Sequence, residues 1–373
     1  MFRFILPHFV AGVIVAGNIF AQSPGPKPST ASPGKPGGIA DQSPAPSPSA
    51  SPSPSNEQLI NSLTAADLQA AIPLLKANFT KPDAINETDL SRATLQGLMV
   101  RLGRGLILLP NKPATTTEPP APFYGEILEN HIGYVRAGSL TNANLQAMDK
   151  KLIEFSSKKI DALVIDLRSS SSDDFTAAAD FAKRFCPKGK TLFTLRKAGK
   201  QDRAFPSDRD PTYQGLTFVL VDGDTSGGAE ALAASVRGLN KTLVIGQPTA
   251  GRAVEYSDLP LPSGKILRVA IAEVAAPDGQ SLYPQGVKPD LPVEISMADK
   301  RQIFQVSMDK GMGPFVYETE RPHLNEAALI AGTNPELESA EQRRNRALDK
   351  MPRDGVLQRA MDLITSLEIF QRR

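Results

Sequence analysis

The 373-residue chain has no tryptophan, a single cysteine, Cys186, and three histidines. One cysteine can form neither an intramolecular disulfide nor a cysteine-based zinc site, and so few histidines argue against a metal centre. We therefore expect no cofactor and no metal, and we interpret Cys186 as a partly buried hydrophobic side chain. The 42 basic and 40 acidic residues leave a net charge of only +2. Such a balanced chain has no strong field for phosphate, which predicts no nucleic-acid partner.

The first 21 residues have the pattern of an export signal. Arg3 precedes an apolar run from Phe4 to Phe20, and Ala21 supplies a small residue for cleavage. Residues 1–21 are therefore predicted to be a signal peptide, and the mature protein is expected to be periplasmic or extracellular, without a membrane span. A retained membrane anchor is the alternative interpretation, because the run approaches the length that a span requires.

A proline-rich segment follows. Residues 22–55 hold ten of the 32 prolines, mixed with serine, alanine and glycine, and show no apolar periodicity. A segment of this composition cannot bury enough apolar surface to fold. It is predicted to be a disordered linker, either a passive one or one that docks a partner.

Helical patterns flank the central part of the chain. Residues 56–122 are predicted to form a helical segment and a loop, with a capping pair at Thr64 and Asp67 and a second helix from Asp89 to Leu102. Residues 299–373 are predicted to form a polar, mostly helical tail. The apolar residues expected on one face of each terminal helix are Leu68, Ile72 and Leu75 in the first, and Leu357, Ala360, Ile364 and Leu367 in the last.

Residues 123–298 alternate between strand and helix patterns. This alternation predicts an α/β domain, and the continuous apolar run at 162–165 is typical of a strand covered on both faces. The expected strands lie at 132–135, 162–165, 191–194, 218–221, 243–245 and 267–271, and the expected helices lie near 145–155, 174–185 and 228–236.

Five segments of this domain, in order, resemble the carboxyl-terminal processing (tail-specific) serine peptidases, family S41. They are His131–Arg136, Leu163–Arg168, Val221–Glu230, Val244–Thr249 and Gly286–Asp290. The resemblance implies a ClpP/crotonase-like α/β core and an exported peptidase ancestor. Only about 20 residues separate Leu109 from His131, too few for the PDZ domain that the family carries at this place.

The positions that carry the chemistry of the family differ here. The resemblance places the nucleophilic serine three residues before Glu230, where this chain has Gly227. It places the lysine base 22 residues after Glu230, where this chain has Arg252. A glutamine that orients the lysine falls on Tyr256. A pair of glycines that lines the site is replaced by Ser172 and Asp173.

Both replacements remove a reactive group. Glycine has no hydroxyl, and a guanidinium with a pKa above ~12 cannot accept a proton. Ser226 is the rescue candidate for the nucleophile and His131 a candidate base, but the alternative for Ser226 is a helix N-cap. The chain is therefore interpreted as an S41-type pseudoenzyme, with Ser226 as the residue that would overturn this.

The same residues have candidate binding roles. The former substrate cleft is expected to be lined by Gly227, Gly228, Arg252, Ser172 and Asp173, with the two glycines as a possible anion cradle. Arg252 would either clamp a carboxylate, such as a peptide C-terminus, or form a buried ion pair with Glu230 or Asp222. The run Ser169–Asp174 is predicted to cap the following helix.

The sequence thus favours an exported, non-proteolytic S41-like protein. Its cleft is predicted to bind an extended peptide or an unfolded polypeptide segment by strand addition, which needs backbone donors and no nucleophile. The alternatives are an active serine-type peptidase that uses Ser226, and a structural scaffold of the cell envelope. The oligomeric state stays open.

Overall fold

A computed structural model describes residues 60–78, 80, 86–110, 119–239, 241–316 and 352–371. The predicted signal peptide and proline-rich linker lie outside these ranges. Within them, every helix is too short or too polar to cross a membrane. The chain divides into two units, Met1–Ala77 and Asn78–Arg373, and each is described by itself.

The first unit contains the helix α2 (Ala65–Asn78), which crosses its boundary by one residue. The predicted cap is confirmed, because the Thr64 hydroxyl donates to Asp67 Oδ2 at 2.6 Å and the Asp67 N–H donates back to Thr64 Oγ1 at 3.2 Å. The apolar face expected on this helix buries no side chain. Leu68, Ile72 and Leu75 remain 50%, 43% and 52% exposed.

The second unit begins with α3 (Glu87–Leu102), two residues earlier than predicted. Asn86 sets this start, because its Oδ1 accepts the N–H of Asp89 at 2.9 Å. A single 3₁₀ turn, η2 (Gly103–Gly105), then leads into the strand β1 (Leu106–Leu109).

The centre of the second unit is a six-stranded sheet in the order β13-β10-β8-β4-β3-β2. Its strands are β2 (Tyr124–Leu128), β3 (Ile132–Arg136), β4 (Ala162–Asp166), β8 (Leu216–Val221), β10 (Thr242–Gly246) and β13 (Leu291–Pro292). All neighbours are parallel except β2, which runs antiparallel to β3. Every residue of β3 and β4 is buried. The predicted α/β fold and its double-sided strands are confirmed.

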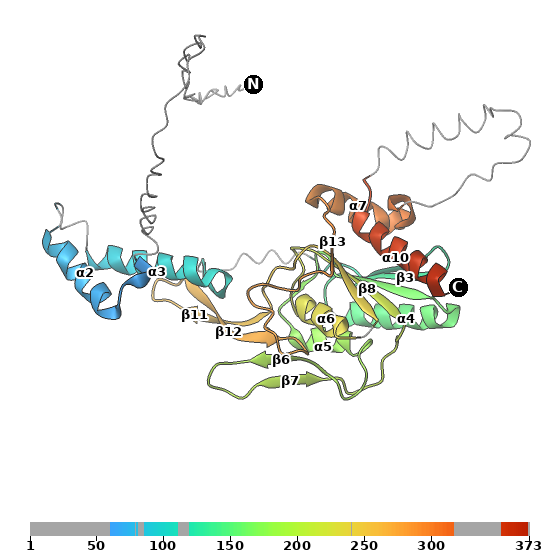
Figure 1. Cartoon of the computed structure of the whole chain (residues 1–373), viewed down its shortest axis with the longest axis horizontal. Helices are drawn as coiled ribbons and strands as arrows, with labels where there is room; N and C mark the ends of the chain where they lie inside the picture. The colour runs from blue at the N-terminus through green and yellow to red at the C-terminus, as the bar shows by residue number, and fades with distance from the viewer. Residues whose placement is uncertain are drawn as a thin grey trace, which may run out of the picture. The chain divides into compact units, whose positions relative to one another are not determined.

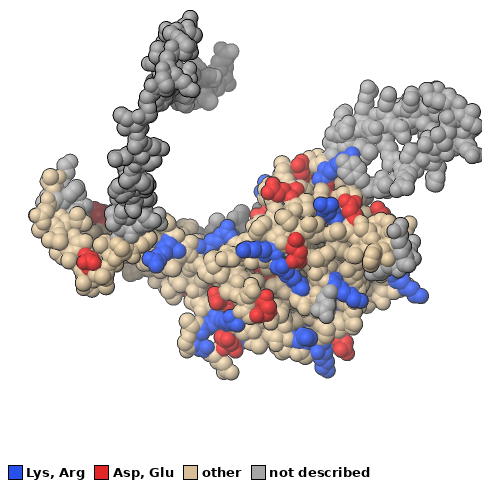
Figure 2. Space-filling model, in the orientation of Figure 1, with Lys and Arg blue, Asp and Glu red and all other residues tan. Residues whose placement is uncertain are grey.

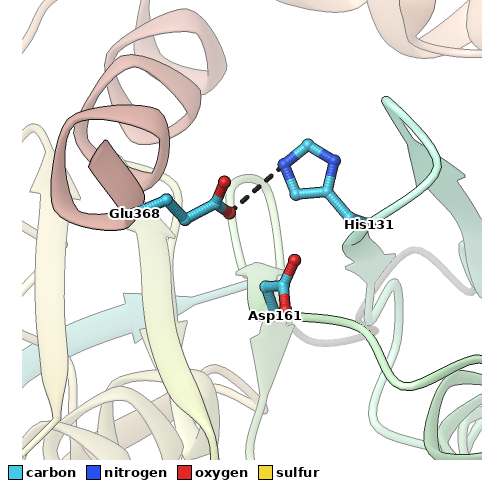
Figure 3. A group of neighbouring side chains, drawn as sticks. All are labelled: His131, Asp161 and Glu368. Carbon is cyan, nitrogen blue, oxygen red and sulfur yellow. Dashed lines mark ion pairs between the residues drawn. The ribbon is translucent and has the colours of Figure 1, made fainter. Parts of the chain in front are cut away.

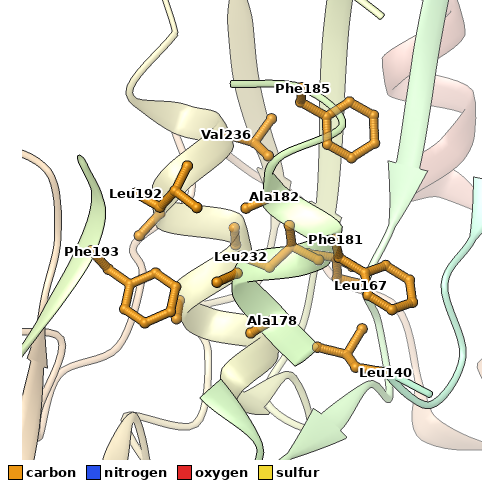
Figure 4. Packing of buried hydrophobic residues seen from close by; sticks show 14 of the residues in the cluster. Leu140, Leu167, Ala178, Phe181, Ala182, Phe185, Leu192, Phe193, Leu232 and Val236 are labelled. Atoms are coloured by element: carbon orange, nitrogen blue, oxygen red, sulfur yellow. The ribbon is translucent and has the colours of Figure 1, made fainter. Parts of the chain in front are cut away.

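Alternate residues of these strands belong to two separate apolar clusters. Figure 1 shows the helices around the sheet, and Figure 4 shows part of the first cluster. Val135 and Leu163 pack in a cluster with the helices α4, α5 and α6, whereas Tyr134 and Val164 pack in a cluster with α7 and α10. The helices are α4 (Asn142–Lys158), α5 (Phe175–Ala182), α6 (Gly228–Arg237), α7 (Met297–Lys310) and α10 (Gly355–Gln371). The sheet is therefore the middle of three layers, as the two-residue period of a strand requires.

The last helix packs as its apolar spacing predicts. Leu357, Ala360 and Ile364 are fully buried, and Leu367 packs against the same cluster. This helix therefore covers one face of the sheet, although more than 30 residues separate it from α7 along the chain.

A buried ionic cluster fixes the start of this helix to the sheet. The Arg168 guanidinium, 1% exposed, donates to Asp166 Oδ2 at 2.6 Å and to both carboxylate oxygens of Asp354 at 2.8 and 2.7 Å. Burial lowers the pKa of Arg168, but the two carboxylates outweigh it and raise the pKa well above its usual value. Asp354 also accepts the N–H of Leu357 at 3.0 Å, so it caps α10 as well.

A second, five-stranded sheet lies outside the predicted alternation of strand and helix. Its order is β1-β12-β6-β7, with β11 also paired to β12, and its bounds are β6 (Thr191–Arg196), β7 (Arg203–Pro206), β11 (Val254–Pro260) and β12 (Ile266–Ala275). The expected strands near 191–194 and 267–271 belong to this sheet and not to the central one. The pattern missed β7, which has only four residues, and β11, and most side chains of both strands are partly or fully exposed.

Candidate functional site

The candidate site lies where the chain leaves β8 and enters α6. Asp222 organises this turn, since its Oδ1 accepts the N–H groups of Ser169, Asp224 and Thr225 at 3.1, 3.0 and 3.0 Å. Its Oδ2 binds the ammonium of Lys300. Burial raises the pKa of Asp222, but the hydrogen bond and charge of Lys300 prevail and hold it below its usual value. The turn is thus fixed to the loop that follows β4.

Two short strands, β5 (Ser171–Ser172) and β9 (Ser226–Gly227), pair in parallel beside this turn. Gly227 has φ +62° and ψ −119° and is the N-cap of α6. A Cβ at this position would lie 2.2 Å from the carbonyl oxygen of Ser172 and 3.8 Å from Asp173 Oδ1. The position expected for the nucleophile therefore has no side chain and no room for one unless the β5 backbone moves.

Gly228 is the first residue of α6, and its glycine serves packing. A Cβ there would lie 3.1 Å from the Ala178 Cβ and 3.3 Å from the Ser172 Cβ, so the small residue allows α5 and α6 to approach closely. The N–H of Gly227 donates to Glu230 Oε2 at 3.0 Å. The N–H of Gly227 is therefore not available for the anion cradle considered for these two glycines, because it already binds a carboxylate of the same helix.

The carboxylate of Glu230 joins the two degenerate positions. Glu230 is fully buried, and its Oε2 accepts the N–H groups of both Gly227 and Arg252, at 3.0 and 2.7 Å. Its Oε1 accepts the hydroxyl of Thr249 at 2.5 Å and the N–H of Gly251 at 2.7 Å. Four donors therefore satisfy one buried carboxylate, and the backbones of Gly227 and Arg252 meet at the same oxygen.

The side chain of Arg252 does not form the buried ion pair that the sequence suggested. Its side chain is exposed, while Glu230 binds backbone and hydroxyl groups and Asp222 binds Lys300. Three backbone N–H groups and one hydroxyl already satisfy the acceptor sites of the Glu230 carboxylate, so it does not need the guanidinium. The guanidinium is therefore left at the surface, where it can meet a ligand.

Tyr256 lies in the field of this guanidinium. Partial burial raises the pKa of its hydroxyl, and the charge of Arg252 opposes this effect while Asp173 adds to it. The Tyr256 hydroxyl donates to the carbonyl of Arg104 at 2.9 Å. The residue that replaces the orienting glutamine is thus bound to the turn after α3.

Ser226 does not cap α6 as expected, since Gly227 takes the N-cap position. The Ser226 hydroxyl lies 2.7 Å from the hydroxyl of Ser171, and its N–H donates to the carbonyl of Ser170 at 3.0 Å. A serine hydroxyl is no base near neutral pH. The contact of Ser226 in this structure therefore supplies no group that could activate it.

His131 is too far away to act as that base. It precedes β3, whereas Ser226 follows β8, and the parallel strands β3, β4 and β8 place these residues at opposite edges of the sheet. The five residues of β3 alone span about 16 Å. The only residues near His131 that could help it hold a metal, within the described part of the chain, are Asp161 and Glu368.

The remaining site residues fall on β5 and the loop after it. Asp174 caps α5 as predicted, because its Oδ1 accepts the N–H groups of Thr176 and Ala177 at 2.8 and 3.0 Å. Ser172 supplies the carbonyl beside Gly227, and Asp173 is exposed at the same place. Ser172 and Asp173 thus lie beside Gly227, but the sequence gave no sign that Ser171 and Ser172 pair with Ser226 and Gly227.

Two cavities lie near this part of the fold without including it. One of about 420 Å³ lies between the end of α6 and the loop near Pro277, and one of about 470 Å³ lies beside β12. Gly227 and Arg252 line neither. On the face shown in Figure 2, basic and acidic side chains are interspersed.

Comparison with known proteins decides the family. Residues 131–293 match the model of peptidase family S41. This segment belongs to that family. The match confirms the predicted S41-type α/β core and includes Gly227, Glu230 and Arg252.

Named relatives of the S41 segment are processing proteases. The carboxy-terminal processing protease CtpA of Bacillus subtilis is 21% identical over 179 residues, covering 48% of this chain and 38% of the relative. The chloroplastic carboxyl-terminal-processing peptidase 2 of Arabidopsis thaliana is 27% identical over 175 residues, covering 46% and 34%. The chain thus matches little more than a third of the length of these relatives. The solved photosystem II D1 C-terminal processing protease is 20% identical, with a TM-score of 0.42, covering 56% of this chain and 53% of that one.

The buried position of Cys186 agrees with its expected structural role. The side chain is 2% exposed, and its Sγ lies 3.6 Å from the carbonyl of Ser235. Burial raises the pKa of the thiol to about 12. The residue is more deeply buried than predicted and has little thiolate near neutral pH.

Proposed function

We propose that this chain is a non-proteolytic S41 protein that binds an extended peptide beside Arg252. The observation that carries the proposal is the shared oxygen of Glu230, which brings Gly227 and Arg252 together. Where the family needs a hydroxyl and a proton acceptor, these two positions supply neither. The same proposal includes the division into a linker, an α/β domain at 123–298 and a C-terminal tail. It also includes export to the periplasm or the extracellular space.

The local backbone supports the loss of the nucleophile. A side chain at position 227 would have to displace the Ser172 carbonyl. A serine at this position would therefore clash with the backbone of β5. Ser226 offers its hydroxyl to Ser171 and not to a base. No observation therefore favours the alternative of a peptidase that uses Ser226.

An open strand edge supports peptide binding. Among the described strands, β11 pairs only with β12, so its other edge is free to accept a further strand. The strand begins two residues after the exposed Arg252. A peptide that pairs with this edge can place its terminal carboxylate on the guanidinium, which suits bidentate pairing.

The binding test compares two forms of one peptide. An extended apolar peptide with a free C-terminus is titrated against the full chain by fluorescence anisotropy, beside the same peptide with an amidated C-terminus. We expect the free acid to bind about tenfold more tightly, the gain of one charge-assisted pair. Arg252→Gln should abolish this difference, whereas Arg301→Gln, at an exposed arginine of α7, should retain it.

The activity test uses the same protein. Unfolded casein should stay intact, and a fluorophosphonate probe should label neither wild type nor Ser226→Ala. Casein cleavage that Ser226→Ala abolishes would show an active peptidase. Equal affinity for both peptides, unchanged by Arg252→Gln, would contradict the carboxylate clamp.

A further inference from the structure

Three side chains gather at the edge of the sheet opposite the candidate site (Figure 3). His131 immediately precedes β3 and Asp161 immediately precedes β4, and the N–H of Asp161 donates to the carbonyl of His131 at 2.9 Å. Glu368 comes from the last turns of α10, which packs on the same strands. Segments far apart in the sequence thus bring together one imidazole and two carboxylates.

The hydrogen bond of the imidazole defines which nitrogen is free. His131 Nδ1 lies 2.6 Å from the carbonyl oxygen of Glu129. A carbonyl can only accept, so Nδ1 carries the hydrogen, and in the neutral ring Nε2 presents its lone pair. A ring held in this way by a backbone carbonyl has the tautomer that a metal-binding histidine requires.

The free nitrogen faces an acceptor. His131 Nε2 lies 3.2 Å from Glu368 Oε1, and both atoms are buried without a hydrogen-bond partner, although the side chains are 29% and 21% exposed overall. Two acceptors at this distance repel unless a positive charge lies between them. The pair therefore requires either a proton on the ring or a metal ion.

The third side chain, Asp161, favours a metal ion over a proton. The ligand atoms of His131, Asp161 and Glu368 all lie within 4.8 Å of one another. A proton needs only the histidine and one carboxylate, whereas a metal ion uses all three. Tetrahedral ligands of zinc lie about 3.4 Å apart, a spacing that the His131–Glu368 pair already has and that the exposed Asp161 can reach by a small movement.

We propose that His131, Asp161 and Glu368 bind a divalent transition-metal ion of the zinc class. One nitrogen and two carboxylate oxygens suit Zn²⁺, whereas Mg²⁺ and Ca²⁺ favour oxygen ligands alone. The ion binds α10 to the start of β3 and β4. The site is independent of peptide binding, since it lies at the other edge of the sheet.

Direct binding tests the ligand set. The untagged full chain is treated with a chelator, and Zn²⁺ is titrated by calorimetry and Co²⁺ by its visible absorption. We expect one ion per chain with a Kd below about 0.1 mM, and at least tenfold weaker binding in His131→Gln, Asp161→Asn and Glu368→Gln. Asp362→Asn, at an exposed residue of the same helix, should bind as wild type does. Asp161→Asn is the most informative variant, because Asp161 is exposed and its replacement is expected to disturb the fold least.

Amide hydrogen exchange tests what the ion does. Zn²⁺ should slow exchange in α10 of the wild type, Mg²⁺ at the same concentration should not, and the three variants should show no change. The proposal is overturned if zinc does not bind, which leaves a histidine–glutamate ion pair alone. It is also overturned if His131→Gln binds zinc equally well, or if bound zinc leaves exchange in α10 unchanged.

Discussion

A glutamate lies at each of two opposite edges of the central sheet, at the carboxyl and at the amino ends of its strands, and the two have different hydrogen-bond partners. At the carboxyl ends of the strands, Glu230 is fully buried and accepts four hydrogen bonds. At the amino ends, Glu368 has a buried oxygen that lies 3.2 Å from His131 Nε2 and has no hydrogen-bond partner. The first edge needs no ligand, whereas the second needs a proton on the imidazole or a metal ion. The carboxylate that joins the backbones of Gly227 and Arg252 is thus satisfied within the fold, whereas the histidine and glutamate at the opposite edge need a positive charge between them.

Replacing each glutamate by glutamine should give the largest difference in the free energy of unfolding between the two edges. In Glu230→Gln an amide NH₂ must face donors that now bind a carboxylate, so we expect a loss of about 3 kcal/mol or more in the free energy of unfolding. In the metal-free protein, Glu368→Gln should cost less than about 1 kcal/mol, because the amide can donate to His131 Nε2. Urea unfolding of both variants measures the difference. Equal losses would show that the two edges are not distinct.

A methyl group at Gly227 tests how tightly the first edge is closed. Gly227→Ala places its Cβ against the Ser172 carbonyl at positive φ, and we expect it to cost about 2–4 kcal/mol in the free energy of unfolding. Gly189→Ala is the matched control, since Gly189 also has a positive φ, of +83°, but has open space where its Cβ would lie. It should cost about 1 kcal/mol. Similar losses in the two variants would mean that strain alone, and not the carbonyl, closes the site.

The contribution of Asp222 to the free energy of unfolding should depend on pH. The native pKa of Asp222 lies below its usual value, so its contribution to stability is present above the usual aspartate range and is lost as the pH falls through the native pKa. Asp222→Asn should therefore be much less stable than the wild type at pH 7, and the difference should shrink below about pH 4. Urea unfolding across this range measures it. Exposed Asp210→Asn should follow the wild type throughout, and a constant gap for Asp222→Asn would contradict the Lys300 pairing.

The sequence predicted what depends on local pattern. The apolar runs of β3, β4 and β8, the caps at Thr64 and Asp174 and the face of α10 all follow from periodicity and capping chemistry, and each is confirmed. The degenerate positions Gly227 and Arg252 were located by resemblance to a family.

What the sequence could not predict depends on partners distant along the chain. One of the two roles considered for Arg252 was an ion pair with Glu230 or Asp222, but four other donors satisfy the Glu230 carboxylate and Lys300 binds Asp222. The contact between His131 and Glu368 joins residues far apart along the chain, and no periodicity in the sequence predicts it. β11 was missed because an edge strand with one neighbour has no continuous apolar run to reveal it.

Arg168 limits how far the molecule can be shortened. A fragment trimmed to the family-matched residues 131–293 would retain this arginine and Asp166 but lose Asp354, and it would also remove the helices that cover Tyr134 and Val164. A guanidinium would then lie beside one carboxylate on a bare apolar face. We therefore expect a fragment of residues 131–293 to be much less stable than the full chain.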